Sequence, residues 1–287
     1  MYIILYFVMI KITHNSGFFS CCSYRLFKII EYFNKKKCLP ETIDTTNSFT
    51  WYKPENRLEQ DIITDYFTLT ADEIEYNKNI ELSQKVFDVQ FYDYNKLYFD
   101  DFNPFINKFF TPSDDILSIV SSIENKYNLP DYKNLCVLFY RGNDKMKETI
   151  PPSYSDFFRK ALELKRKNEN IRFLLQSDES EFLTAMLKLF PDSIVFIDQI
   201  RHINKDCDTV DRVYYGNNYN FSKNFLAIII IMSKCSHIIC TSGNCSLWVI
   251  FFRGNANNVI QYLNQKEYIY GVPNPHYDKD KTDFWIE

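Results

Sequence analysis

The sequence predicts an α/β fold with a parallel, doubly wound sheet in its C-terminal half. First, short apolar segments alternate with amphipathic helical segments between residues 135 and 262, and such alternation builds parallel sheets. Second, 194–197 is an unbroken apolar run, as expected of a strand buried on both faces. Third, the chain is 46% hydrophobic and 17% aromatic, so it can form a large core rather than stay disordered.

The N-terminal part carries fewer periodic signals. A first buried strand is predicted at 2–13, which is mainly apolar, and a helix at 20–34, where apolar residues recur at helical spacing. Residues 38–60 contain two prolines and are predicted to form loop and short strands. Residues 61–110 are dense in Tyr and Phe, and their periodicity favours neither helix nor strand.

A helix start is predicted at Pro112-Ser113-Asp114-Asp115. Ser or Asp can cap a helix, and acidic residues are favoured in its first turn. We expect this helix to end near Asn128 and to separate two domains. The expected division is an N-terminal α/β domain at 1–112, a linker helix at 113–130 and a C-terminal domain at 131–287.

The second half is predicted to alternate strand and helix, with a long polar loop after its third strand. The expected strands are 135–140, 171–176, 193–198, 236–240 and 257–262. The expected helices are 154–168, 179–190, 222–234 and 245–253.

Three of these strands end in small, polar or charged residues. Ligands of open α/β sheets bind outside the carboxyl ends of the strands, so we expect one site for a phosphate-containing ligand. The candidate residues are Arg141, Asn143, Asp144 and Lys145 after the first strand, Ser177 and Asp178 after the second, and Thr241, Ser242, Gly243 and Asn244 after the fourth.

Each segment offers a suitable group. The Arg141 guanidinium presents a fork of donors to phosphate oxygens, Asp144 can orient it, and Lys145 can add charge. The helix start at 241–244 has backbone N–H groups that can bind phosphate, and Gly243 permits close approach. The alternative for each segment is structural: a surface ion pair after the first strand, and capped helix starts at the other two.

Charge and cysteine content exclude several classes of protein. The formal net charge is -4 with a pI of about 5.7, which argues against a general nucleic-acid binder. None of the eight cysteines forms a C-x-x-C pair, so a zinc ribbon or thioredoxin-like motif is unsupported. A reducing compartment, and hence the cytoplasm, is the simpler interpretation. The apolar start ends at Lys11, short of the roughly 20 residues that span a membrane, so no integral span is expected.

Three segments resemble the motif blocks of the fucosyltransferases. Tyr140–Lys145 is similar to the first block of the α-1,2, α-1,6 and protein O-fucosyltransferases, in which an Arg stands three residues before an Asp. Gln176–Glu179 resembles the second block, and Met232–Trp248 looks like the third block of the α-1,2 family. The blocks occur in the family's order over about residues 135–262.

The resemblance implies a GT-B-like architecture of two Rossmann-like domains, with the acceptor side in 1–112 and nucleotide-sugar binding in 131–287. It implies GDP-fucose or a related GDP-sugar as donor, a glycan or protein hydroxyl as acceptor, inversion at the sugar carbon, and no required metal or other cofactor. The family's phosphate-binding Arg corresponds to Arg141, whose charge would also assist catalysis by neutralising the leaving diphosphate. The third-block contacts correspond to Ser242, Gly243 and Asn244.

The chain departs from the family pattern at three places. Ala227 and Ile228 stand where members often carry the acidic residue that helps to read guanine. Gly142 replaces a second Arg, and the segment 14–19 replaces a Gly-rich N-terminal block. His14 is the candidate catalytic base in that segment, by location alone; a structural histidine is the alternative.

Three other functions remain open on the sequence. Asp206-Cys207-Asp208 has the D-x-D form of a metal-dependent GT-A transferase. Residues 243–248 resemble the nucleophile segment of ovarian-tumour-type deubiquitinases, with Cys245 at a helix start, where its pKa would fall, and His276 as the base. The third alternative is a catalytically degenerate module that binds sugar or protein.

Overall fold

The C-terminal half forms a five-stranded sheet in the computed structural model, which describes residues 9–71, 74, 80, 89–129, 131–205, 208–214, 216–269, 271–274, 277–281 and 284–287. The strand order is β11-β8-β7-β5-β6. Strands β5, β6, β7 and β8 are parallel, and β11 runs antiparallel to β8. Their bounds are β5 Leu135–Tyr140, β6 Arg172–Ser177, β7 His237–Thr241, β8 Val259–Tyr262 and β11 Trp285–Ile286.

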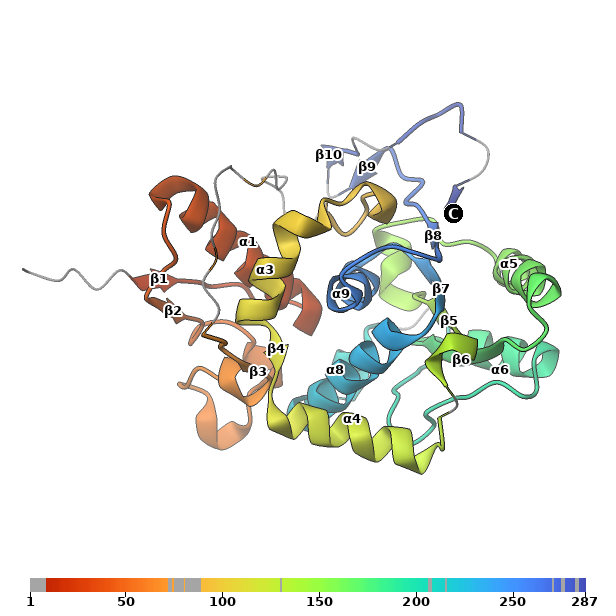
Figure 1. Ribbon diagram of the computed structural model, residues 1–287, viewed down its shortest axis with the longest axis horizontal. Helices are drawn as coiled ribbons and strands as arrows, with labels where there is room; N and C mark the ends of the chain where they lie inside the picture. The colour runs from red at the N-terminus through yellow and green to blue at the C-terminus, as the bar shows by residue number, and fades with distance from the viewer. Residues whose placement is uncertain are drawn as a thin grey trace, which may run out of the picture.

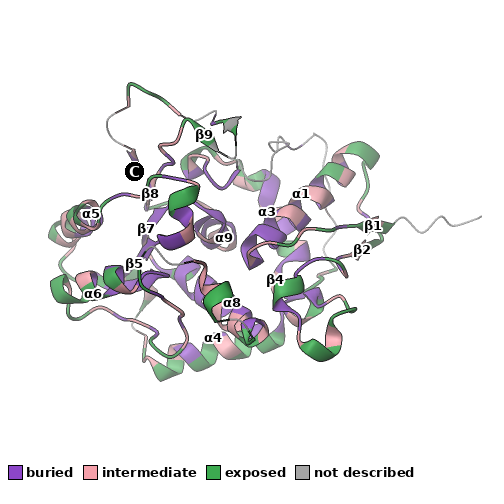
Figure 2. Cartoon of the chain, turned by 180° about the vertical axis from the view of Figure 1, so that it is seen from behind, coloured by how far each residue is buried: buried purple, intermediate pink, exposed green. Residues whose placement is uncertain are grey.

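Helices cover both faces of this sheet (Figure 1). Helices α8 (Asn218–Lys234) and α9 (Asn244–Arg253) lie on one side, and α5 (Tyr154–Lys167) and α6 (Ser180–Leu189) lie on the other. All six residues of β5 are buried for this reason. Figure 2 shows the sheet between buried helix faces, with the exposed positions on the outside. The predicted α/β class with a mainly parallel sheet is confirmed.

The sheet has a point at which the strand order reverses. The chain leaves β5 for β6 on one side, then crosses to β7 on the other side of β5 and continues to β8. The connections that leave β5 and β7 therefore diverge, and a crevice opens between the carboxyl ends of the two strands. The ends of the strands predicted at 135–140 and 236–240 meet at this crevice.

The prediction of a strand at 193–198 is wrong. Only Ile194 bridges to the sheet: its N–H donates to the Phe173 carbonyl at 2.8 Å, and its carbonyl accepts from the Leu175 N–H at 2.9 Å. After Phe196 the chain enters turns, and Ile197 is 69% exposed. The segment therefore covers the edge of β6 without extending the sheet, and an apolar run alone did not distinguish this packing from a central strand.

The other predicted elements of this half are confirmed with shifted ends. The helix predicted at 222–234 starts earlier, at Asn218, and the helix predicted at 245–253 starts at Asn244. Helix α4 (Asp114–Lys126) begins as predicted, with the Ser113 hydroxyl accepting from the Ile116 N–H at 3.5 Å. In its described part, the polar loop after 198 contains one short helix, α7 (Val210–Val213).

The N-terminal half contains two small strand pairs within its described residues. Strand β1 (Met9–Lys11) pairs in parallel with β2 (Thr42–Asp44), and the long helix α1 (Phe18–Lys36) connects them. Strand β3 (Phe67–Thr68) pairs antiparallel with β4 (Thr111–Pro112), after helix α3 (Phe99–Phe109). A further pair, β9 (Tyr268–Ile269) with β10 (Val272–Pro273), lies near the C-terminus.

The strand predicted at 2–13 needs correction in its described part. It is an edge strand rather than a buried one, with Met9 57% exposed, because it pairs only with β2. Residues 2–8 of that prediction lie outside the described residues, as do 72–73, 75–79 and 81–88 of the ambiguous segment. No helix in the described part of the chain is both long and apolar enough to cross a membrane.

The two halves share one continuous core around Trp248. Its ring on α9 packs 6.1 Å from Phe19 of α1 and 4.7 Å from Phe110, measured between ring centroids. Its indole N–H donates to the Ser23 hydroxyl at 2.9 Å, and Ser23 donates to the Asn244 side chain at 2.8 Å. The start of α9 is therefore held by the N-terminal half.

We expect Trp248→Ala to lower the free energy of unfolding by about 3–5 kcal/mol, because it removes a large buried ring and leaves a cavity. Urea denaturation followed by far-UV circular dichroism would measure the change. Leu117→Ala, at an exposed position of α4, should stay within about 0.5 kcal/mol of the parent. A cost for Trp248→Ala as small as that of Leu117→Ala would contradict a shared core.

Candidate functional site

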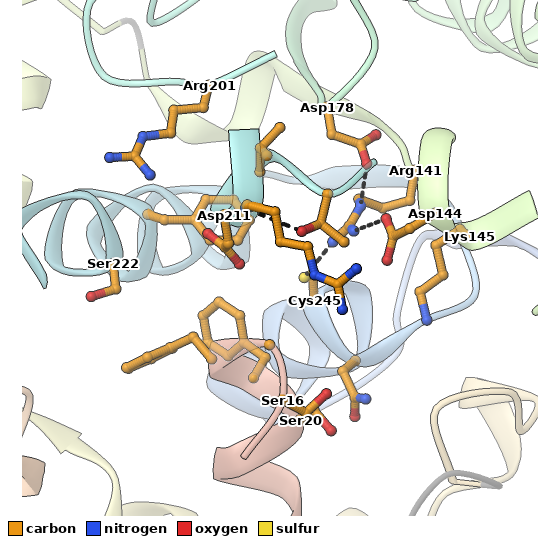
Figure 3. A pocket seen from close by; sticks show the side chains of 18 of the residues that line it. Ser16, Ser20, Arg141, Asp144, Lys145, Asp178, Arg201, Asp211, Ser222 and Cys245 are labelled. Carbon is orange, nitrogen blue, oxygen red and sulfur yellow. Dashed lines mark hydrogen bonds and ion pairs between the residues drawn. The ribbon is translucent and has the colours of Figure 1, made fainter. Parts of the chain in front are cut away.

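A pocket of about 330 Å³ opens at the carboxyl ends of β5 and β7 (Figure 3). The N-terminal half contributes residues 16–20 at the start of α1 and 51–52 in the short helix η1 (Thr50–Tyr52). The C-terminal half contributes the ends of β5 and β6, the start of α9, and parts of α7 and α8. Its size lies in the range of small-molecule sites.

Arg141 connects the three predicted strand ends within this pocket. Its Nε donates to Asp178 Oδ2 at 3.1 Å, its Nη2 to Asp144 Oδ1 at 3.2 Å, and its Nη1 contacts Cys245 Sγ at 2.9 Å. Its backbone N–H donates to the Thr241 hydroxyl at 3.2 Å. The side chain is only 16% exposed. The predicted convergence of these segments is therefore present in the structure.

The electrostatics of Arg141 are set by two opposing effects. Burial works to lower the pKa of its guanidinium, but the neighbouring Asp178, Cys245 and Asp144 outweigh burial and raise that pKa well above the ordinary value. Arg141 is therefore a permanent cation. The contact between Arg141 and Asp144 agrees with the orienting role predicted for Asp144.

Asp178 and Glu179 organise the loop that follows β5. Asp178 Oδ1 accepts from the Gly142 N–H at 2.9 Å, and Glu179 Oε1 accepts from the Asn143 N–H at 3.3 Å. Asn143 donates its side-chain amide to the Asp178 carbonyl at 2.8 Å. Asn143 is thus a buried loop residue that does not line the pocket.

Gly142 is explained by the close approach of Glu179. A Cβ at this position would stand 2.1 Å from Glu179 Oε1, and Tyr154 donates a hydrogen bond to the same carboxylate. Burial raises the pKa of Glu179 despite the hydrogen bond from Tyr154. The space that a larger side chain at 142 would need is therefore filled by the carboxylate of Glu179.

The N–H groups at the start of α9 are not all free, contrary to the prediction for 241–244. The Gln90 side-chain oxygen accepts from the Asn244 N–H at 3.2 Å and from the Lys145 ammonium at 3.0 Å. The Gly243 N–H donates to the Tyr94 hydroxyl at 3.3 Å. Two side chains from the N-terminal half thus occupy donors that the sequence assigned to a phosphate.

Lys145 contributes less free charge than predicted. It is buried, ion-paired with Glu148, and lies 5.4 Å from the Phe91 ring centroid. Together with the bond to Gln90, these contacts hold the ammonium at the wall of the pocket. An anion bound there would meet a cation that already has a carboxylate partner.

Ser177, Thr241, Ser242 and Gly243 support the site from behind and do not line the pocket. The Ser242 hydroxyl donates to the Tyr262 carbonyl at 2.8 Å and accepts from Gln261 at 2.9 Å. The Ser177 hydroxyl accepts from the Glu179 N–H at 3.0 Å, inside the turn before α6. Gly243 has φ 156° and ψ 165°, a conformation nearly exclusive to glycine.

His14 lies next to the pocket without lining it. Its Nε2 is 3.0 Å from the hydroxyl of Ser20, which does line the pocket, and its ring stacks on Tyr24 with 4.7 Å between centroids. Burial lowers the pKa of His14, so its imidazole is mainly neutral near pH 7. Ser20 therefore stands between His14 and the pocket.

Several pocket residues were missed by the sequence analysis. Asp211, Arg201 and Arg212 come from the loop and short helix between β6 and α8. Arg201 lies 4.1 Å from the Phe221 ring centroid and donates to the Asn218 side chain at 2.6 Å. A polar loop without periodicity offers no local signal for such placement. Gln90 was also missed, because its role depends on contacts with Lys145 and Asn244, which are distant from it in the sequence.

The cysteine-hydrolase alternative finds little support in the described residues, and most of the D-x-D segment lies outside them. Burial raises the pKa of Cys245, although Arg141 and Lys145 oppose it, which is the reverse of what a nucleophilic thiolate requires. His276, its suggested base, lies outside the described residues, as do Asp206 and Cys207. Asp208 pairs with Arg212 at 3.0 Å. No cluster of three or more His, Cys, Asp or Glu with metal-binding geometry occurs among the residues that the structure describes.

Comparison with solved structures identifies the fold. A NodZ α-1,6-fucosyltransferase soaked with GDP-fucose is similar with a TM-score of 0.51 and 9% identity, over 89% of this chain and 94% of that one. The fucosyltransferase NodZ from Bradyrhizobium has a TM-score of 0.45 and 10% identity, over 89% of this chain and 95% of that one. At this identity the first likeness shows a shared fold. No protein-family model and no curated protein matches the sequence.

We expect Gly142→Ala to lower the free energy of unfolding by about 1–3 kcal/mol, because its Cβ would displace the Glu179 carboxylate. A double-mutant cycle with Glu179→Ala, measured by urea denaturation, tests the cause. The cost of Gly142→Ala should shrink when Glu179 is shortened, because the two residues compete for one space. If Gly142→Ala lowered the stability equally with and without Glu179→Ala, the loss would not arise from contact with Glu179.

We expect Cys245 to react with iodoacetamide more slowly than the exposed Cys38 at neutral pH. The raised pKa keeps Cys245 in its thiol form, and the thiolate is the reactive species. Peptide mapping by mass spectrometry after brief alkylation of the native protein would rank the two sites. Preferential alkylation of Cys245 would favour the cysteine-hydrolase alternative.

Proposed function

We propose that this protein is a fucosyltransferase that transfers fucose from GDP-fucose to a hydroxyl of a glycan or protein. The observation that carries the proposal is the position of Arg141: it stands at the reversal point of the sheet, inside the pocket, in a chain that shares its fold with an α-1,6-fucosyltransferase. That enzyme was soaked with GDP-fucose. The motif resemblance around residues 140–145 and 232–248 supports the same donor.

The chemistry of the pocket suits departure of a diphosphate. When the bond between the sugar carbon and the diphosphate breaks, negative charge develops on the leaving oxygen. A guanidinium held by Asp178 and Asp144 is already oriented before the reaction, and such preorganised charge lowers the barrier. We assign this catalytic role to Arg141, with Asp144 and Asp178 as its positioning residues and Lys145 as a nearby second cation.

We further propose an inverting reaction without a required metal, in a GT-B-like arrangement of two Rossmann-like domains. In this arrangement 1–112 binds the acceptor, 113–130 links the domains, and 131–287 binds the nucleotide-sugar. Asn143, Ser177, Thr241, Ser242 and Gly243 shape the donor site from behind, and Asn244 faces the donor. His14 acts on the acceptor side through Ser20.

The nucleobase of the donor is not recognised at the position where fucosyltransferases often carry an acidic residue. Ala227 and Ile228 lie inside α8, are fully buried, and do not line the pocket. The stacked rings of Phe221 and Phe225, with centroids 5.8 Å apart, form an aromatic part of the pocket wall instead, and the Arg201 guanidinium lies over Phe221, 4.1 Å from its centroid. We assign the nucleobase to this wall, because aromatic surfaces can stack on a planar base.

We expect GDP and GDP-fucose to raise the melting temperature of the parent protein in the presence of a chelator, more than UDP, CDP or TDP do. A ligand at about 100 times its dissociation constant stabilises the native state by about 2.7 kcal/mol. Arg141→Ala should abolish the shift and lower the melting temperature of the free protein, because the buried Asp178 and the partly buried Asp144 lose their partner. Differential scanning fluorimetry measures both effects.

Arg159→Ala is the matched control, because within the described residues Arg159 forms exposed ion pairs on α5 and does not line the pocket. It should keep the full GDP shift. A folded Arg141→Ala protein with unchanged GDP affinity would overturn the site, and a parent protein stabilised by no nucleotide would favour the binding-module alternative. Stabilisation that requires manganese would restore the metal-dependent alternative.

A further inference from the structure

Asp211 differs from every other described carboxylate that lines the pocket. Five acidic residues line it, and four of them form ion pairs with a basic side chain. The pairs are Asp144 and Asp178 with Arg141, Glu148 with Lys145, and Asp208 with Arg212. Within the described residues Asp211 has no ion pair, so its charge is not committed to a neighbouring cation.

One oxygen of Asp211 is held by Tyr52. The Tyr52 hydroxyl accepts from the Phe18 N–H at the start of α1, at 2.8 Å. The proton of that hydroxyl must therefore point the other way, toward Asp211 Oδ2, at 2.7 Å. Tyr52 is fully buried, so this bond has a fixed direction and orients the carboxylate.

The other oxygen of Asp211 has no hydrogen-bond partner among the described residues. The nearby arginines are directed elsewhere: Arg201 donates to Asn218 Oδ1 at 2.6 Å and to the Asn217 carbonyl at 3.0 Å. Arg141 is directed to its own partners. Asp211 and Arg141 both line the pocket, and in the view of Figure 3 Asp211 lies on the side of the pocket away from Lys145. An acceptor hydroxyl in the pocket can therefore reach Asp211 Oδ1.

We propose that Asp211 is the general base that takes the proton of the attacking hydroxyl. This inference rests on the proposed fucosyltransferase function and extends it to a residue that the motif resemblance does not include. The hydroxyl oxygen forms a bond to the sugar carbon, the bond from that carbon to the diphosphate breaks, and GDP leaves with the electron pair. The hydroxyl proton moves to Asp211 Oδ1. Tyr52 is the positioning residue.

The surroundings of Asp211 suit a base. Burial raises the pKa of its carboxyl, while the hydrogen bond from Tyr52 and the charges of Arg141 and Arg201 lower it, and Asp144 raises it. The net shift is upward, which makes the carboxylate a stronger base than an exposed Asp. Arg212 and Asp208 of the same segment are paired with each other, so their charges largely cancel at Asp211.

Hydrolysis of GDP-fucose by the full-length chain tests the proposal without knowledge of the natural acceptor, because water then serves as the acceptor. We expect Asp211→Asn to lower the rate of GDP release by about 10²–10⁴-fold, the usual contribution of a general base. The melting-temperature shift caused by GDP-fucose should persist, because Asn can still accept from Tyr52. Asp198→Asn, at an exposed surface ion pair, is the matched control and should keep the parent rate.

Azide distinguishes a base from a structural residue. Azide is an anion without a proton to lose, so its attack on the sugar carbon needs no base. With azide, Asp211→Ala should release GDP at a rate near that of the parent with azide, and fucosyl azide should form. Full hydrolytic activity of Asp211→Asn, or no recovery with azide in a folded variant that binds donor, would overturn the assignment. A parent protein that neither binds nor cleaves GDP-fucose would instead overturn the proposed function.

The pH profile supplies an independent measurement. The base acts as a carboxylate, so the parent rate should be present above the raised pKa of Asp211 and fall as the pH drops through it. Tyr52→Phe removes a hydrogen bond that lowers this pKa, so the acid limb of the profile should move to higher pH. A Tyr52→Phe variant whose limb does not move would show that Tyr52 only packs.

Discussion

The buried guanidinium of Arg141 is the constraint on which the rest of the site depends. A charge with so little exposure is costly unless it is paired, and the structure pairs it with carboxylates from two different segments, Asp144 and Asp178. These contacts bind the loop after β5 to the loop after β6, while the backbone of Arg141 is bonded to β7 through Thr241. The ends of three strands thus form one rigid surface.

The same pairing limits what Arg141 can offer to a ligand. Two carboxylates compensate one guanidinium, and Glu148 compensates Lys145, so the pocket is not a strongly positive cleft. A diphosphate would have to share Arg141 with Asp144 or displace a weaker contact such as Cys245. This arrangement favours orientation and selectivity over raw attraction, in keeping with a net charge of -4 for the whole chain.

The N-terminal half completes the site instead of merely covering it. Gln90 and Tyr94 bond to the start of α9, and Tyr52 bonds to Asp211. Because Gln90 accepts from both Asn244 and Lys145, one amide oxygen occupies two groups that suit a phosphate oxygen. The donors at the end of β7 are therefore coupled to the position of the N-terminal half, through the same core that encloses Trp248.

The sequence by itself determined the α/β class, most element positions in the second half, and the meeting of three strand ends. These follow from local patterns: the periodicity of apolar residues, Ser and Asp at helix starts, and strand ends that share one edge of a parallel sheet. Only the tertiary structure decided that 193–198 lies at the sheet edge, and that Ser242 faces away from the pocket. The tertiary structure also decided that Gln90, Tyr52 and Asp211 reach the pocket from segments without a clear periodic pattern. The physical reason is that hydrogen bonds and ion pairs between distant segments depend on how the halves pack, and local periodicity carries no information about that packing.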